Sequence, residues 1–363
     1  MEIRSLTLLT TDKCNYNCSY CYQKKTSGQD IDPLIAQKAI KYVLNNSGFD
    51  LDIIFSGGEP LLKFYLIDKC VFFVNRKDKS FKKNINFSII TNGSMIDNDV
   101  LSIFDENSFD VQYSFDVYLK EKREERKNFD NLLEILSKLI KLKHISLSTN
   151  TVFTPDNADK IFDSVEFLLK KGVNQIGIGI DQTSYWDNES LDIFEEELAR
   201  TKDLVIKEYL RTGKIVVDYF NLDEPSGINM CGAGGDKLTV SPDGSLWGCP
   251  SFYYYDWENS FEEKENYCYG KVDDLDNGDF EMKYEKIISN YRKFRTDNFR
   301  TENNKCFLCE YLLECRICPA QKYSFLPEKR SMFTVPEMVC KMNKIIFGIN
   351  REFRREVKGK NRY

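Results

Sequence analysis

Short apolar runs alternate with amphipathic stretches along the first half of the chain. This alternation predicts strands joined by crossover helices, which is the pattern of a parallel sheet. The six expected strands are Leu6–Thr10, Leu51–Phe55, Ile85–Ile90, Val111–Phe115, Ile145–Val152 and Gln175–Ile180. The expected helices between them are Pro33–Asn45, Leu62–Asn75, Asn98–Asp105, Asn128–Lys141 and Asn157–Lys171.

Six strand–helix units predict an α/β fold with a partial (β/α)6 barrel of the TIM type. In such barrels the active site lies at the carboxyl ends of the strands. A further helix is expected over Asp187–Leu210, and it ends before Gly213. Residues that directly follow the strands are therefore the first candidates for a functional site.

The sequence changes in character after Pro225, where glycine, tyrosine and cysteine become dense and the strand–helix repeat stops. A boundary is expected near 215–230, with the barrel over 1–215 and a small Cys-rich domain over 216–363. The chain is expected to end in a helix, Lys341–Tyr363, with a basic end. That end is either a contact for an acidic leader peptide or a nucleic acid, or a solvated helix end whose cations the helix dipole favours.

Composition narrows the classes of function. No apolar run among the 363 residues approaches the roughly 18 residues of a membrane span. The N-terminus lacks the features of a signal peptide, so we expect a cytoplasmic protein without a membrane partner. A net charge of −6 gives no support to nucleic-acid binding as the main function. The single histidine, His144, excludes a zinc site with two histidines and disfavours histidine acid–base catalysis.

Three of the 12 cysteines directly follow the first predicted strand. Cys14, Cys18 and Cys21 have the spacing C-x3-C-x2-C, so a single loop can wrap one small cluster. Three thiolates leave one iron of a four-iron cluster without a protein ligand, and an open position is typical of reactive metal sites. The alternative, a disulfide knot, needs an oxidising compartment and usually a small secreted chain.

This loop, with an aromatic residue before its last cysteine, resembles the signature of radical S-adenosylmethionine enzymes. The resemblance implies that Cys14, Cys18 and Cys21 hold a catalytic 4Fe–4S cluster whose open iron binds S-adenosylmethionine. It also implies that reductive cleavage of this cofactor gives a 5′-deoxyadenosyl radical, which abstracts hydrogen from an unactivated C–H bond.

The same resemblance implies cofactor contacts at the ends of the following strands. A Gly-Gly-Glu-Pro turn contacts the cofactor's amino group in this family, and two glycines allow a close approach of the backbone. Arg123 matches an arginine that pairs with the cofactor's carboxylate, with Arg126 as its rival, and Tyr20 is expected beside the adenine. The implied set is Tyr20, Gly57, Gly58, Glu59, Pro60, Asn92, Ser114 and Arg123.

Eight cysteines lie beyond the predicted barrel. Their spacing closely resembles the SPASM domain, which carries two further 4Fe–4S clusters in peptide-modifying radical enzymes. The resemblance assigns Cys306, Cys309, Cys315 and Cys340 to the distal cluster, and Cys231, Cys249 and Cys318 to the nearer one. With the barrel cluster, this makes three 4Fe–4S clusters.

Two departures from the SPASM pattern leave alternatives open. Cys315 and Cys318 are separated by two residues instead of three, and Lys237 stands where some relatives have another cysteine. The nearer cluster is therefore either closed by Cys268 or open at one iron. Zinc at Cys306, Cys309, Cys315 and Cys318 is a second alternative, because paired C-x2-C knuckles also bind zinc.

Two further groups of residues have a structural and a functional interpretation. Cys70 lies in an apolar helical stretch and is expected to pack in the core rather than to bind a metal. Aromatic residues crowd the Cys-rich domain, where they either line a groove for an extended peptide or form its core. They are Phe252, Tyr253, Tyr254, Tyr255, Trp257, Tyr267 and Tyr269.

The leading hypothesis is an enzyme that installs a crosslink, thioether or carbon–carbon, in a ribosomally made peptide. An open nearer cluster would bind a substrate thiolate, which favours the thioether. The chain begins thirteen residues before Cys14, so leader recognition is expected to need a separate protein or none. An electron donor such as flavodoxin or ferredoxin is expected as well. The alternatives are oxidation of a Cys or Ser to formylglycine, as in anaerobic sulfatase maturases, and a multi-cluster electron carrier.

Overall fold

The computed structural model describes residues 2–23, 28–81, 83–117, 129–276, 278–323, 325–326 and 329–360. The chain divides into two compact units, each assembled from several segments. Within the described residues, unit 1 draws on 1–114, 123–147 and 232–293, and unit 2 draws on 115–122, 148–231 and 294–363. The predicted domain limits, 1–215 and 216–363, stay a prediction.

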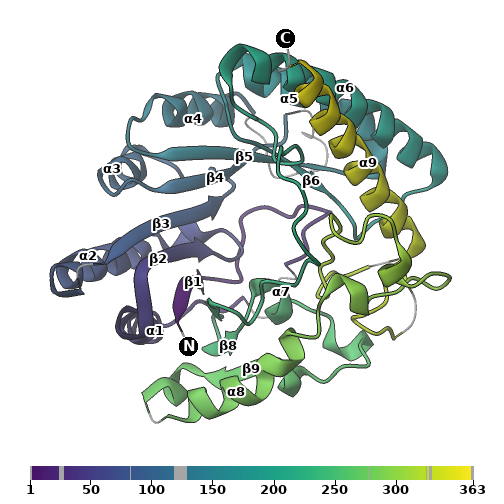
Figure 1. Ribbon diagram of the computed structural model, residues 1–363. Coiled ribbons are helices and arrows are strands. Elements are labelled where there is room, and N and C mark those ends of the chain that lie inside the picture. The colour runs from purple at the N-terminus through teal and green to yellow at the C-terminus, as the bar shows by residue number, and fades with distance from the viewer. Residues whose placement is uncertain are drawn as a thin grey trace. The chain divides into compact units, whose positions relative to one another are not determined.

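Unit 1 is built on a mostly parallel sheet with the strand order β4-β3-β2-β1-β7-β8-β9 (Figure 1). Its first five strands run parallel, because β7 pairs with β1 in the same direction, and β8 and β9 then pair antiparallel. The strands are β1 (Ile3–Leu9), β2 (Ser47–Ser56), β3 (Asn84–Thr91), β4 (Asp110–Ser114), β7 (Lys237–Val240), β8 (Ser245–Trp247) and β9 (Cys268–Lys271).

The helices of unit 1 begin where the sequence supplies caps. Asp32 accepts the backbone N–H of Leu34 at the start of α1, and Asp97 accepts that of Val100 at the start of α3. The helices are α1 (Pro33–Asn46), α2 (Phe64–Phe81), α3 (Asn98–Glu106), α4 (Phe129–Lys141), α7 (Pro250–Tyr253) and α8 (Asp279–Tyr291). The core beneath them is apolar and includes Leu6, Leu8, Ile53, Phe55 and Ile89.

Unit 2 contains a parallel strand pair and three long helices. Strand β5 (Ser146–Phe153), most of which belongs to this unit, pairs with β6 (Ile176–Ile180). The helices are α5 (Ile161–Lys170), α6 (Asn188–Thr212) and α9 (Glu337–Lys360), and α9 lies along α6 (Figure 1). Helix α6 begins after the cap Asp187 and ends at Gly213, whose φ of +73° is left-handed.

The structure confirms the predicted α/β class with a largely parallel sheet, and it is consistent with a partial TIM-type barrel. All six predicted strands and the helices between them are present, with ends shifted by a few residues. The sequence did not predict β7, β8, β9 or α8, because three- and four-residue strands are too short to show a period. No helix among the described residues is long and apolar enough to cross a membrane.

Candidate functional site

The three-cysteine loop leaves the carboxyl end of β1, as the sequence predicts. The Cys14 thiol is partly buried, and its Sγ accepts the backbone N–H of Tyr16 at 3.4 Å. The N–H of Cys21 donates to the carbonyl of Cys18 at 3.1 Å, which closes a turn between these two residues. Cys21 is exposed and Cys18 is partly buried.

The Cys14 thiol lies within electrostatic range of three acidic groups. Burial raises its pKa, the N–H of Tyr16 lowers it in part, and the charges of Glu59, Cys18 and Cys21 raise it further. Mutual repulsion between thiolates is expected wherever several are gathered for one metal group, and a bound cation removes it. The donor set therefore fits an iron–sulfur cluster held by three thiolates.

The segment before Cys14 is anchored by a buried carboxylate. Asp12 is 3% exposed, and it accepts the hydroxyls of Tyr253 at 3.0 Å and Tyr254 at 3.3 Å. Burial and the neighbouring Asp12 charge raise the pKa of Tyr254 far above its usual value, so its hydroxyl stays a donor. The sequence did not identify Asp12, although its position directly between a strand end and a cysteine is a usable signal.

Gly57 and Gly58 bring the turn after β2 into direct contact with this segment. The N–H of Gly58 donates to the carbonyl of Thr11 at 2.7 Å. A Cβ at Gly57 would lie 2.4 Å from the carbonyl oxygen of Thr11, and one at Gly58 would lie 2.1 Å from that of Lys13. Both glycines are therefore needed to hold the cysteine loop, a role that the sequence did not suggest beside their predicted approach to a ligand.

Glu59 links the ends of β2 and β3. Its carboxylate is 1% exposed and accepts three hydrogen bonds. Oε1 accepts the N–H of Leu61 at 3.0 Å and the hydroxyl of Thr91 at 2.7 Å, and Oε2 accepts the N–H of Asn92 at 2.8 Å. Pro60 follows as the first residue of the 3-10 helix η1 (Pro60–Lys63). Within the structure, Glu59 thus orients the next predicted site residue, Asn92.

Asn92 joins the end of β3 to the cysteine loop. Its Nδ2 donates to the Cys14 Sγ at 3.8 Å and to Oδ1 of Asn15 at 3.0 Å. Asn15 donates to the Ser94 hydroxyl at 2.7 Å, and that hydroxyl donates back to Asn92 at 2.6 Å. This closed ring of hydrogen bonds holds the side-chain amide of Asn92 against Cys14, a candidate cluster ligand. Asn15 and Ser94 were not predicted, and only their positions beside Cys14 and Asn92 would have suggested them.

The remaining predicted cofactor contacts are placed as follows. Ser114 is the last residue of β4 and is partly buried, so it lies at the same end of the sheet as Asn92. Tyr20 is partly buried within the cysteine loop. Arg123 and its rival Arg126 lie outside the described residues. The contacts of these residues with a cofactor stay a prediction.

We expect Glu59→Gln to lower the free energy of unfolding by about 1–3 kcal/mol, because the amide offers one acceptor oxygen where three buried donors need partners. Chemical denaturation followed by circular dichroism measures this change. Glu196→Gln is the control, since Glu196 is an exposed carboxylate on α6. Equal stabilities of the two variants would contradict the structural role of Glu59.

Four cysteines of unit 2 line a single cavity of about 340 Å³. They are the four assigned to the distal cluster: Cys306, Cys309, Cys315 and Cys340. Burial raises the pKa of Cys315 to about 12 and that of Cys306 to about 11, and the neighbouring thiols add to both shifts. A cavity of this size has room for a group larger than one metal ion.

The other late cysteines are divided between the two units. In unit 1, Cys249 precedes α7, and Cys268 begins β9 opposite Trp247 of β8. In unit 2, Cys231 donates its N–H to the carbonyl of Phe294 at 2.8 Å, and Cys318 is exposed. Among the residues that the structure describes, no three His, Cys, Asp or Glu side chains already stand at metal-binding geometry. The ligand sets of the auxiliary clusters therefore stay predictions.

The aromatic cluster of unit 1 is a core. Phe252 and Tyr291 are almost fully buried, and their ring centroids lie 4.8 Å apart in an edge contact. Tyr254, Tyr255, Tyr267 and Tyr269 are buried as well. The core interpretation is therefore confirmed for five of the seven predicted aromatic residues, whereas Tyr253 and Trp257 are only partly buried. Cys70 is 5% exposed on α2, which confirms its predicted packing role.

Residues 8–168 match the model of the Radical SAM superfamily. The chain is 26% identical over 347 residues to the radical SAM cyclopropyl synthase TigE of Paramaledivibacter caminithermalis, which covers 86% of this chain and 67% of that protein. It is 25% identical over 353 residues to a cysteine-type anaerobic sulfatase-maturating enzyme of Clostridium novyi, which covers 85% of this chain and 93% of that enzyme. A solved structure of anSMEcpe with bound AdoMet and Cp18Cys peptide gives a TM-score of 0.75, with 99% of both chains covered. At 19% identity this last likeness concerns the fold alone.

The family match begins inside β1 and includes the cysteine loop and the Gly-Gly-Glu-Pro turn. Residues 8–168 are thus a radical SAM domain, and the chain is an enzyme. The proteins that it resembles include a radical SAM cyclopropyl synthase and a sulfatase-maturating enzyme. The electron-carrier interpretation is therefore set aside.

Proposed function

We propose that this enzyme modifies a peptide and installs a thioether or carbon–carbon crosslink by radical chemistry. The observation that carries the proposal is the presence of two separate thiol sites in one chain. One is the three-cysteine loop held against the ends of β2 and β3 in unit 1. The other is the four-thiol cavity of unit 2. The relative anSMEcpe binds a Cp18Cys peptide, which supports a peptide as substrate class.

In this proposal Cys14, Cys18 and Cys21 hold a 4Fe–4S cluster with one open iron for S-adenosylmethionine. When both are bound, they supply a 5′-deoxyadenosyl radical that abstracts hydrogen from an unactivated C–H bond. The protein's own groups provide positioning. Asn92 donates to Cys14, and Glu59 fixes the backbone of Asn92. Tyr253 and Tyr254 donate hydrogen bonds to Asp12, which keeps the loop in place.

The four-thiol cavity is proposed as the distal auxiliary cluster site. Its four cysteines supply a complete thiolate shell, which is typical of a closed 4Fe–4S site. Because burial raises the pKa of Cys306, Cys315 and Cys340, loading must release protons, so we infer that loading is favoured as the pH rises. A zinc site at Cys306, Cys309, Cys315 and Cys318 is less well supported, because Cys340 lines the cavity and Cys318 does not.

The nearer auxiliary cluster would be held by Cys231, Cys249 and Cys318. If its fourth position stays open, it can bind a substrate thiolate as a Lewis acid, and this favours a thioether product. Cys268 is the candidate that would close the position instead. Flavodoxin or ferredoxin is proposed as the electron donor, and the cytoplasm as the place of action.

A second candidate function is the oxidation of a Cys or Ser to formylglycine. It is favoured by the 25% identity with the Clostridium novyi enzyme over most of both chains. Two residues disfavour it. Lys237 stands where sulfatase maturases usually have a further cysteine, and Pro250 stands where they have an aspartate. The crosslinking function is therefore preferred.

We expect about twelve irons and a similar amount of sulfide per chain after anaerobic reconstitution, because three four-iron clusters are proposed. Iron, sulfide and zinc are measured on the same protein sample. About four irons with one equivalent of zinc would contradict the auxiliary clusters and leave only the cluster of the cysteine loop.

The variant Cys268→Ala separates the two states of the nearer cluster in the same assay. An open site predicts that iron content and crosslinking are unchanged. A loss of about four irons would identify Cys268 as a ligand. The thiolate-binding role, and with it the preference for a thioether, would then be wrong.

A further inference from the structure

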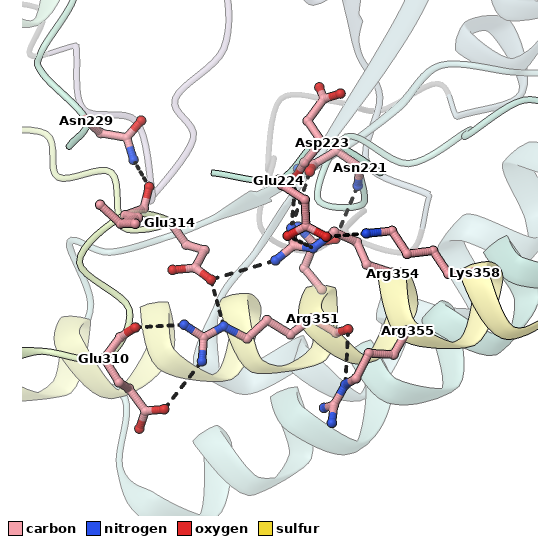
Figure 2. A network of polar contacts seen from close by, with 12 residues as sticks. Asn221, Asp223, Glu224, Asn229, Glu310, Glu314, Arg351, Arg354, Arg355 and Lys358 are labelled. Atoms are coloured by element: carbon pink, nitrogen blue, oxygen red, sulfur yellow. Dashed lines mark hydrogen bonds and ion pairs between the residues drawn. The ribbon is translucent and has the colours of Figure 1, made fainter. Parts of the chain in front are cut away.

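The basic end of helix α9 is engaged in a network of internal contacts (Figure 2). Arg354 is 5% exposed and lies 3.7 Å from Glu314 and 4.0 Å from Glu224. Lys358 pairs with Glu224 as well. For Arg354 the interpretation as part of a solvated helix end is wrong, because its side chain is buried, whereas Lys358 is exposed and its ion pair lies at the surface. Their cations stabilise contacts within unit 2.

Arg351 makes the most extensive contacts in this network. Its Nε donates to Oε1 of Glu314 at 2.7 Å, and its NH2 nitrogen donates to the carbonyl oxygen of Glu310 at 2.7 Å. The NH1 nitrogen lies 3.4 Å from Oε2 of Glu310. The guanidinium also stacks over the ring of Tyr311, with 4.2 Å to its centroid. One side chain therefore contacts both ends of the segment 310–314 as well as its second residue, Tyr311.

The segment 310–314 lies between two candidate cluster ligands. Glu310 follows Cys309 directly, and Glu314 directly precedes Cys315. Arg351 belongs to α9, which also carries Cys340 about three helical turns earlier. Arg351 thus connects the loop that supplies two cavity thiols to the helix that supplies a third.

Two backbone carbonyls at the end of the same segment accept hydrogen bonds from other side chains of unit 2. The side-chain amide of Asn229 donates to the carbonyl oxygens of Leu313 at 2.6 Å and Cys315 at 3.2 Å. The hydroxyl of Thr296 donates to the carbonyl oxygen of Cys315 at 2.8 Å. These contacts fix the carbonyls near Cys315, whereas the contacts of Arg351 fix the side chains and the Cys309 end.

We propose that Arg351 is a positioning residue that sets Cys309 and Cys315 in the four-thiol cavity before a cluster is loaded. The inference deepens the proposed function, because it rests on that cavity being an auxiliary cluster site. Arginine suits the role, since its planar fork reaches two acceptors and stacks on an aromatic ring at the same time. Lysine keeps the charge but can reproduce neither the fork nor the stacking.

The contact between Arg351 and Glu314 is strong by its geometry. It is a charge-assisted hydrogen bond from Nε to Oε1 at 2.7 Å, and such bonds are stronger than those between neutral groups. The contact is expected to persist at moderate salt because Glu314 is largely buried.

The test uses the full-length protein without clusters and the variants Arg351→Met and Arg351→Lys. Arg355→Met is the matched control. Arg355 lies one turn further along α9, is exposed, and donates a long hydrogen bond of 3.4 Å to the carbonyl oxygen of Arg351 in its own helix. Iodoacetamide labelling of each cysteine is followed by peptide mass spectrometry under reducing, metal-free conditions. Circular dichroism shows whether each variant is folded.

In both Arg351 variants, iodoacetamide is expected to label Cys309 and Cys315 at least about fivefold faster than in the wild type. The reason is that the charge-assisted contact of Arg351 no longer opposes local opening of the segment. Cys70 and the Arg355→Met protein should keep wild-type rates. Wild-type rates at Cys309 and Cys315 in folded Arg351→Lys and Arg351→Met would overturn the proposal.

A second measurement separates this inference from the proposed function. After reconstitution, the Arg351 variants should hold about eight irons where the wild type holds about twelve. A wild-type protein with only about four irons would overturn the auxiliary site itself, whatever the labelling shows. Twelve irons in both the wild type and Arg351→Met, with unchanged labelling, would overturn only the role of Arg351.

Discussion

Replacement of Cys14, Cys18 and Cys21 by alanine is expected to abolish formation of 5′-deoxyadenosine from S-adenosylmethionine. The three thiols lie in one loop at the end of β1, and Cys14 lies within electrostatic range of the other two. Without them no open iron remains to bind the cofactor, so activity should vanish rather than decline. The measurement is 5′-deoxyadenosine by liquid chromatography and mass spectrometry after anaerobic incubation with dithionite.

Cys70→Ala is the matched control for this variant. Cys70 is a buried cysteine of α2 whose pKa is raised to about 12 by burial, so it is a neutral packing group. The control should lose about 1 kcal/mol of stability and keep its cleavage activity. The triple variant should also retain about eight irons in the auxiliary clusters. Cofactor cleavage by the triple variant would refute the assignment of the catalytic cluster.

Gly58→Ala is expected to lower cofactor cleavage by about 100-fold or more, because a small misplacement of reacting groups can cost that much. A Cβ at this position would lie 2.1 Å from the carbonyl oxygen of Lys13, one residue before Cys14. The neighbouring hydrogen bond from the N–H of Glu59 to the same oxygen, at 2.9 Å, leaves no room for adjustment. The loop must therefore move away from the ends of β2 and β3.

Gly227→Ala is the control for this second prediction, since nothing lies within 4 Å of a Cβ at that position. Cleavage rates and iron content of both variants are measured after the same reconstitution. Gly58→Ala should impair cleavage while the four irons of the first cluster are retained or partly lost. Equal rates in the two glycine variants would show that the approach of the two loops has no catalytic importance.

The order of strands and helices in the barrel half could be predicted from the sequence because each element is long enough to show its period. Strand β3 and helix α3 are examples, and their observed ends differ from the predicted ends by one residue. Strand β8 has only three residues, and its pairing with β7 and β9 depends on distant parts of the chain. No local pattern reveals such pairing.

The candidate site likewise has features that a local sequence pattern predicts and features that depend on residues far apart in the chain. The three cysteines were found from spacing alone, because a motif within eight residues carries its own signal. The polar ring of Asn15, Asn92 and Ser94 joins residues almost eighty positions apart, so only the fold reveals it. The network of Arg351 was missed for a further reason. The charges of Arg351 and Arg354 were interpreted from the sequence of helix α9 alone, whereas their acidic partners lie on other segments of unit 2.

The central claim is that this chain cleaves S-adenosylmethionine reductively at the cluster of its cysteine loop. The most direct test is to incubate the reconstituted wild-type protein with dithionite and S-adenosylmethionine under anaerobic conditions, and to quantify 5′-deoxyadenosine and methionine. The account predicts that both products form in equal amounts. A protein with its full iron content that forms neither product would contradict it.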